Sequence, residues 1–292
     1  MNHKISVFVV LVFIAFNCII FSGLNFSPFI ISSAQAKDQS PPQTVYRFGV
    51  VPQFEHRKLY RIWIPILQKL EADTGLRFEL IGSRQIPSFE QDFLSGMFDF
   101  AYMNPYHIVA ANNQQGYLPL VRDGSRKLQG IVVVRKDSPI QSIRELRGHL
   151  VAFPSPNALG ASLLPRSELH RLHKIQLKPK YVKTHTSVYL HVVQRLVTAG
   201  GGVESTLQRQ KSEIRDSLRI LYRTRSVNPH PIVAHPRVPA AHVKLVKEAL
   251  IDMGKREKDR ELLAKIPMHT VVEANLNHYS DVAKMKLGEY LE

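Results

Sequence analysis

The chain has 292 residues, of which 44% are hydrophobic, and it carries 39 Lys+Arg against 24 Asp+Glu, a formal charge of +15. The hydrophobic content excludes a disordered chain, and the length beyond the leader suits two modest domains. The positive charges are scattered rather than gathered in blocks, which favours a solvated basic surface or attraction to anionic ligands and membranes over nucleic-acid binding.

The first 36 residues have the features of an export signal. Residues 1–4 are basic, residues 5–31 carry no charge, and residues 33–36 read Ser-Ala-Gln-Ala, an A-x-A site. We expect cleavage after Ala36 and a periplasmic mature protein. The apolar run is also long enough to span a bilayer, so an uncleaved, membrane-anchored form remains an alternative. Cys18 is the only cysteine, so the mature chain would have neither a disulfide nor a thiol nucleophile.

Strands and helices alternate from Tyr46 onward. The spacing predicts strands at 46–51, 77–81, 100–103, 117–121 and 131–134. It predicts helices at 56–74, 88–94 and 106–114. This order is typical of a mostly parallel sheet with helices on both faces.

The segment 99–107 is the most informative part of this first half. Asn104 is a good N-cap, and Pro105 stands where a first helical residue tolerates the loss of its N–H. A buried strand that ends at a capped helix start places unpaired N–H groups at the sheet edge where open α/β sheets bind ligands. Tyr102, Asn104 and Tyr106 would surround that point. The alternative is an ordinary strand–helix turn with core tyrosines.

The pattern then begins again. We expect strands at 150–153, 180–183 and 219–222, with helices at 159–174 and 188–197, the latter broken by Gly200–Gly202. Helices are expected at 243–253, 259–265 and 281–291. The predicted organisation is a first lobe of residues 44–135 and 229–292 and a second lobe of residues 136–228.

Four segments carry a resemblance to a known family. They are residues 48–52, 95–106, 132–148 and 151–156, the last followed by Pro165. Together they resemble the phosphate/phosphite/phosphonate-binding proteins of ABC transporters, within the type II periplasmic solute-binding proteins, from about Tyr46 to the C-terminus. The resemblance implies two Rossmann-like lobes that close on a small ligand by hinge motion.

The resemblance also implies site residues. Phosphonate binders of this family contact the ligand with a tyrosine at the position of Tyr102. Their Ser-Thr-Ser run at the second lobe's first long helix is replaced here by Ala-Leu-Gly at 158–160, although Asn157 and Ser162 lie nearby. Their Gly-His-Asp segment becomes Thr-His-Thr-Ser at 184–187, which keeps His185. We therefore expect the fold to transfer and specificity for an amine-bearing phosphonate not to transfer.

Other chemistry has little support in the sequence. His170 and His173 have helical spacing for a metal but stand among basic residues, and His230 and His235 stand among prolines with no carboxylate near in sequence. No nucleophile elbow, phosphate loop or pair of catalytic carboxylates is present.

We therefore expect a monomeric, exported solute-binding protein without catalytic residues, metal or cofactor. It would capture a small anionic ligand, phosphonate- or phosphate-like, for an ABC permease. The residues expected to line the cleft through neutral hydrogen bonds and helix termini are Tyr102, Asn104, Tyr106, Asn157, His185 and Ser187.

Two alternatives remain open at this point. One is a ligand-sensing periplasmic protein that signals to a membrane receptor or kinase without transport. The other is an enzyme on the same fold, as in pyrimidine-synthesising relatives, whose chemistry uses cysteine and histidine clusters that a cysteine-free mature chain lacks.

Overall fold

The computed structural model of this chain describes residues 44–291. The expected signal peptide at 1–36, its cleavage site and Cys18 lie outside the described residues and stay predictions. Among residues 44–291, no helix combines the length and the apolar character that crossing a membrane requires.

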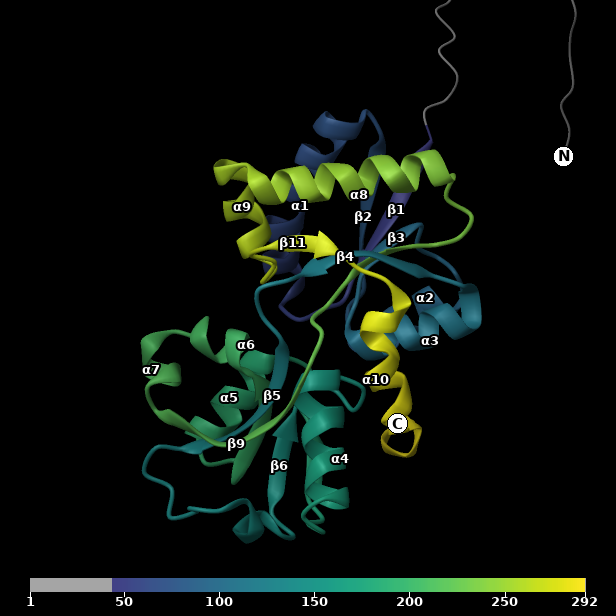
Figure 1. Cartoon of the computed structure of the whole chain (residues 1–292). Coiled ribbons are helices and arrows are strands. Elements are labelled where there is room, and N and C mark those ends of the chain that lie inside the picture. The colour runs from purple at the N-terminus through teal and green to yellow at the C-terminus, as the bar shows by residue number, and fades with distance from the viewer. Residues whose placement is uncertain (1–43, 292) are drawn as a thin grey trace, which may run out of the picture. The chain divides into compact units, whose positions relative to one another are not determined.

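Two β-sheets organise the described residues (Figure 1), with strand orders β11-β4-β10-β3-β1-β2 and β7-β6-β8-β5-β9. The strands of the first sheet are β1 (Val45–Val50), β2 (Arg77–Gly82), β3 (Phe100–Tyr102), β4 (Leu118–Asp123), β10 (Ile232–Ala234) and β11 (Val271–Glu273). Those of the second are β5 (Leu128–Arg135), β6 (Leu150–Phe153), β7 (Lys178–Tyr181), β8 (Ala199–Val203) and β9 (Leu218–Val227). The expected α/β class is confirmed.

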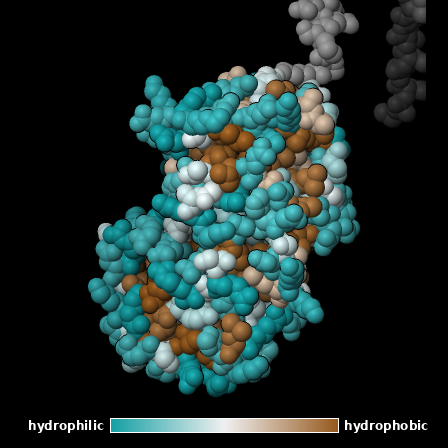
Figure 2. Space-filling model, viewed as in Figure 1, coloured by the Kyte–Doolittle hydropathy of each residue, from teal (hydrophilic) through white to brown (hydrophobic). Residues whose placement is uncertain are grey.

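Helices and helical turns cover both sheets. Those that follow first-sheet strands are α1 (His56–Thr74), α2 (Ile86–Leu94), α3 (Pro105–Gln115), α8 (Ala240–Lys255), α9 (Glu257–Ala264), η3 (Leu276–Tyr279), α10 (Ser280–Lys284) and η4 (Leu287–Tyr290). Those of the second are η1 (Ile143–Leu146), η2 (Leu159–Leu163), α4 (Leu164–Arg171), α5 (His185–Val193), α6 (Glu204–Gln208) and α7 (Ser212–Arg215). On the face shown in Figure 2 the surface is mostly hydrophilic, with hydrophobic residues in scattered patches.

The strand pairing is mixed rather than mostly parallel. In the first sheet β1 pairs in parallel with β2 and β3, whereas β10 runs antiparallel to β3 and β4, and β11 runs antiparallel to β4. In the second, β6 is parallel to β7 and β8, and β5 is antiparallel to β8 and β9. β5 and β10 are the strands that follow the two passages of the chain between the sheets, and a strand that enters a sheet by such a passage needs no crossover helix. β11 is the further reversed strand of the first sheet and follows β10 through α8 and α9.

The first sheet is held by an aromatic core that the helical spacing of α1 predicts. The side chains of Trp63, Ile66 and Leu70 are buried on one stripe of this helix. The Trp63 ring lies 5.3 Å from that of Phe48 on β1, and each large apolar side chain of this kind contributes roughly 1.5–3 kcal/mol when fully buried. Pro65 lies inside α1, as the sequence predicts.

β5 is buried on both faces, which explains its unbroken apolar sequence. Ile131 and Val133 pack in the cluster that contains Val188 of α5, and Val132 and Val134 pack in the cluster that contains Leu169 of α4. Alternate side chains therefore serve opposite faces, and a strand with this pattern is a central one.

The pairing of β5 changes the expected passage between the sheets. Because β5 pairs with β8 and β9, residues 128–135 belong to the second sheet, not to the first as the expected 44–135 lobe required. The sequence of a short apolar strand does not indicate which sheet the strand joins. The chain crosses between Asp123 and Leu128, and it returns between Val227 and Ile232, within the expected region. The division into two lobes itself stays a prediction.

A second correction concerns Gly200–Gly202. These glycines do not break a helix ahead of a strand but form the buried strand β8. A Cβ on Gly202 would lie 2.2 Å from the Tyr189 hydroxyl of α5. Glycine is used here because a helix side chain lies directly on the strand, a use of glycine that composition alone does not reveal.

Candidate ligand-binding site

The corner between β3 and α3 is built as the sequence predicts. Asn104 is the N-cap, and its Oδ1 accepts hydrogen bonds from the backbone N–H groups of Tyr106 and His107, both at 2.8 Å. Pro105 is the first helical residue. The same Asn104 side chain places its Nδ2 2.9 Å from His107 Nε2. Both polar atoms of its side chain therefore lie within hydrogen-bonding distance of groups of the chain itself.

Tyr102 is buried, and its hydroxyl is engaged as well. The hydroxyl donates to the Ile266 carbonyl at 3.0 Å. Its ring lies 5.1 Å from that of Trp63 and stacks on His230 at 5.3 Å and 22°. Burial raises the pKa of the Tyr102 phenol, so the group stays neutral.

His230, which the sequence indicated only weakly as a metal ligand, lies in the candidate site. It lies in the return passage between the sheets, and its Nε2 is 2.8 Å from Gln53 Nε2, just after β1. Burial first, then the nearby His107 and His185, lowers the pKa of His230 to about 3. Its place in a predicted passage between lobes was the signal that could have identified it.

Glu90 links the two sides of the site. Its Oε1 lies 3.0 Å from His107 Nε2, and its Oε2 accepts from Asn157 Nδ2 at 2.9 Å. Glu90 belongs to α2 beside the first sheet, and Asn157 follows β6 of the second. Tyr106 lies close enough for Glu90 to raise its phenol pKa, after a larger effect of burial. Nothing in the sequence pattern of α2 singled out Glu90.

His185 begins α5 and lies in a buried polar network. Its Nδ1 is 3.2 Å from Thr206 Oγ1, which is 2.7 Å from the Tyr189 hydroxyl. Burial lowers the pKa of His185 to about 4, so the imidazole is neutral at pH 7.

The start of α5 differs from the expectation. The helix begins at His185 rather than at 188, because Thr184 supplies the cap: its Oγ1 accepts from the Ser187 backbone N–H at 3.1 Å. The Ser187 hydroxyl lies 2.9 Å from the same oxygen. Thr184 caps the helix because it has an extended backbone immediately before the first helical residue, from which its hydroxyl reaches the N–H group three residues on.

The segment between β6 and α4 contains two serine hydroxyls of a different kind. The side chains of Ser155 and Ser162 are 5% and 0% exposed, and neither Oγ makes a hydrogen bond in the described part of the chain. Ala158 and Ala161, from the same segment, pack in the apolar cluster that contains Tyr102. This segment therefore faces the β3–α3 corner.

The backbone of this segment is a π-helical turn, η2, that runs into α4. Pro165 follows it as an early residue of α4 and has no N–H to complete an ordinary helical bond. A Cβ on Gly201 would lie 2.1 Å from the Ala161 carbonyl oxygen, so η2 rests directly on β8. The first N–H groups of a helix lack intrahelical acceptors, and those of Leu159, Gly160 and Ala161 have no other acceptor among the described residues. π-Turns of this kind are frequent at functional sites.

Metal chemistry finds no support in this geometry. No group of three or more His, Cys, Asp or Glu side chains within residues 44–291 is arranged to hold an ion. The neutral imidazoles, hydroxyls and N–H groups of the site are instead suited to hydrogen bonding of a small polar ligand.

The chain passes twice between two α/β sheets, and buried polar groups lie between them. This is the arrangement of the two-lobed solute-binding proteins. A family model described as an ABC transporter, phosphonate, periplasmic substrate-binding protein matches residues 48–279. The chain belongs to this family.

Individual relatives are distant. The chain is 19% identical to the phosphonates-binding periplasmic protein of Escherichia coli over 81% of this chain and 73% of that one. It superposes with a TM-score of 0.77 on a binding protein component of an ABC phosphonate transporter from Pseudomonas aeruginosa, at 15% identity over 85% and 87% of the two chains. It superposes with a TM-score of 0.75 on PhnD1 of Prochlorococcus marinus in complex with methylphosphonate, at 15% identity over 82% of this chain and 96% of that one. These structures confirm the type II periplasmic binding fold.

Family membership decides between the functions left open by the sequence. The chain is a periplasmic substrate-binding protein of the ABC-transporter type, and its family is a transport component rather than an enzyme. The membership implies an extracytoplasmic location and does not favour the signalling alternative.

Proposed function

We propose that this protein binds a small phosphorus oxyanion, such as a phosphonate or phosphate, and delivers it to an ABC permease. The observation that carries the proposal is the pair of buried Ser155 and Ser162 hydroxyls without hydrogen-bond partners in the described chain. A buried polar group without a partner costs about 1–3 kcal/mol, so such a pair is expected where a ligand supplies the partner.

The surrounding groups favour an anion over a cation. Hydroxyls donate, the N–H groups at the start of η2 carry the positive end of the helix dipole, and the imidazoles of His185 and His230 are neutral. Glu90 is the nearby carboxylate, and it is engaged by His107 and Asn157. Direct hydroxyl and N–H donors can hold an oxyanion without an ion pair.

The expected lining residues take distinct roles in this proposal. Asn157, His185 and Ser187 stand with the two serines on the side of the second sheet. Tyr102 orients His230 by ring stacking and does not offer its hydroxyl, while Asn104 fixes the start of α3 and so the position of Tyr106. The serines replace the missing run at 158–160, one on each side of it.

Calorimetric titration of the purified protein with methylphosphonate, phosphate and phosphite tests this proposal. Hydrogen bonds to a charged ligand contribute about 1.5–3 kcal/mol each, so Ser155→Ala/Ser162→Ala should weaken binding about 100-fold. Ser167→Ala is the matched control, since this buried hydroxyl in α4 donates locally to the Leu164 carbonyl at 3.0 Å. Equal affinities in the double variant and the wild type would overturn the serine site. No binding of any of these anions would overturn the oxyanion class.

The lobes, the leader and the oligomeric state belong to the same proposal. We propose that the two sheets form lobes that close on the ligand, that residues 1–36 are removed on export, and that the protein acts as a monomer. Intact mass of the exported protein and its elution volume in gel filtration check the last two.

A further inference from the structure

A large cavity lies beside the candidate site and contains an unusual set of cations. It has a volume of about 750 Å³. Its walls come from the first passage between the sheets, from α6, and from the segment after α9, and its charged or titratable lining residues are Arg126, Lys127, Glu204, Arg209 and His269. A volume of this size is in the range of pockets that hold small organic ligands.

Three of these residues are cations without a carboxylate partner. Arg126, Lys127 and Arg209 make no ion pair within the part of the chain that the structure describes, although many other arginines do. Like charges gathered around one space repel each other unless an anion lies between them.

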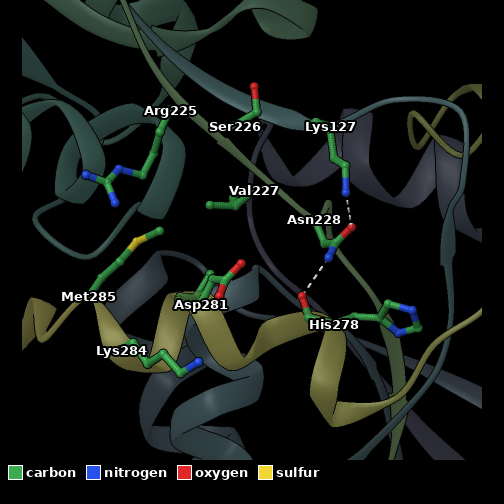
Figure 3. Close-up of a pocket in the computed structure, with 10 residues that line it drawn as sticks. Lys127, Arg225, Ser226, Val227, Asn228, His278, Asp281, Lys284 and Met285 are labelled. Carbon is green, nitrogen blue, oxygen red and sulfur yellow. Dashed lines mark hydrogen bonds between the residues drawn. The ribbon is translucent and has the colours of Figure 1, made fainter.

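Two of the cations are held in place by neutral partners. Lys127 Nζ donates to Asn228 Oδ1 at 2.6 Å, and Asn228 in turn donates to the His278 carbonyl, a chain that Figure 3 shows from the side of a smaller neighbouring pocket. Arg209 donates to the carbonyls of Ala264 and Lys265 at 2.8 and 2.7 Å, at the end of α9. These bonds orient the charges and leave them uncompensated.

The acidic groups nearby do not balance these three cations. Glu204 is paired with Arg223, with Arg223 Nη2 2.9 Å from its Oε1, and this pairing lowers the Glu204 pKa. Asp123, near His269, accepts hydrogen bonds from the backbone N–H groups of His269 and Thr270. The cavity therefore keeps a positive charge.

Electrostatic effects support the closeness of these groups. Burial, and then Arg126, lowers the pKa of His269, and Arg209 contributes in the same direction. Pro267, which lines the cavity, follows Ile266, whose carbonyl accepts from the Tyr102 hydroxyl, so the cavity lies next to the candidate ligand site.

We propose that this cavity is a second anion site, which accepts a phosphate-type polyanion through Arg126, Lys127 and Arg209. The polyanion is either a free molecule or the distal anionic part of a larger ligand whose first group occupies the serine site. In both cases it would contact segments next to both sheets and so stabilise their closed arrangement.

Titration of the purified protein with inorganic pyrophosphate tests the proposal. Arg126→Gln/Lys127→Gln should weaken pyrophosphate binding at least about 100-fold, because each of the two lost charge-assisted contacts contributes about 1.5 kcal/mol or more. It should also reduce the sensitivity of binding to added NaCl. Arg209 is left unchanged because it also holds the end of α9. The matched control is Lys178→Gln/Lys180→Gln, which removes the same charge from the exposed edge strand β7.

Pyrophosphate that binds the Arg126→Gln/Lys127→Gln variant as tightly as wild type, or that binds neither, would overturn the second site. The Ser155→Ala/Ser162→Ala variant separates the two sources. If this variant still binds pyrophosphate, the polyanion is a free molecule in its own site. If the variant no longer binds pyrophosphate, one ligand spans both sites. The proposed function fails on a different result, namely unchanged methylphosphonate binding by the serine variant.

Discussion

The two strand–helix corners that face each other across the candidate site differ in how their buried polar side chains are hydrogen-bonded. In the β3–α3 corner, Asn104 and Tyr102 are fully engaged by the chain itself. In the corner between β6 and α4, Ser155 and Ser162 are equally buried but have no partner among the described residues. In the first corner the buried Nδ1 of His107 also has no partner among the described residues, but the expected ligand contacts Tyr102 and Asn104 are satisfied there, whereas the second corner leaves both of its serine hydroxyls unsatisfied. Burial alone therefore does not distinguish these two pairs of side chains, whereas their hydrogen bonding does.

The largest expected effect concerns the neutral His185 on the side of the second sheet. Its folded-state pKa of about 4 lies below the ordinary 6.5, so between these values the unfolded chain binds more protons and stability falls as the pH falls. The full loss from this residue is about 3 kcal/mol of unfolding free energy. In urea denaturation, the fall in unfolding free energy between pH 7 and 4 should be about 3 kcal/mol smaller for His185→Gln than for the wild type. The exposed His173→Gln serves as control, and equal acid slopes in wild type and His185→Gln would refute the buried neutral imidazole.

Asn104→Ala should destabilise the first corner by about 2 kcal/mol, because a buried cap with two backbone donors is lost. The midpoint of chemical denaturation measures this. Asn113→Ala, exposed on the same helix, should change stability by less than about 0.5 kcal/mol. A similar small change for Asn104→Ala would contradict the structural role of this residue.

Tyr102→Phe tests whether the Tyr102 hydroxyl serves the fold or the ligand. It removes the bond to the Ile266 carbonyl and should cost about 1 kcal/mol of stability, while methylphosphonate affinity changes less than about twofold. Tyr60→Phe is the control, since its half-buried hydroxyl also donates to a carbonyl, that of Leu80. A tenfold loss of methylphosphonate affinity in Tyr102→Phe would instead show that the Tyr102 hydroxyl contacts the ligand.

The smallest effect is expected at Glu90, which joins the two corners. Glu90→Gln removes a negative charge but keeps an acceptor for Asn157, so an anionic ligand should bind about two- to fivefold more tightly. Glu71→Gln, a half-buried carboxylate on α1, controls for the general change in charge. Weaker anion binding in Glu90→Gln would indicate that the ligand carries a positive group facing this carboxylate.

Local rules of sequence determined much of this protein. The stripe of α1, the Asn104 cap with Pro105 behind it, and the alternation of strands and helices follow from spacing and backbone chemistry within a few residues. The marks shared with the phosphonate-binding family were readable for the same reason, because they are short segments in a fixed order.

Only the tertiary structure decided the features that depend on distant neighbours. The sheet that β5 joins, the use of Gly200–Gly202 as a strand under α5, and the link from Glu90 to Asn157 are set by residues far away in the chain. Tyr102 looks like a ligand contact in the sequence, yet Ile266, 164 residues later, takes its hydroxyl. Ser155 and Ser162 look ordinary in the sequence, and only the packing around them shows that they are buried without a partner among residues 44–291.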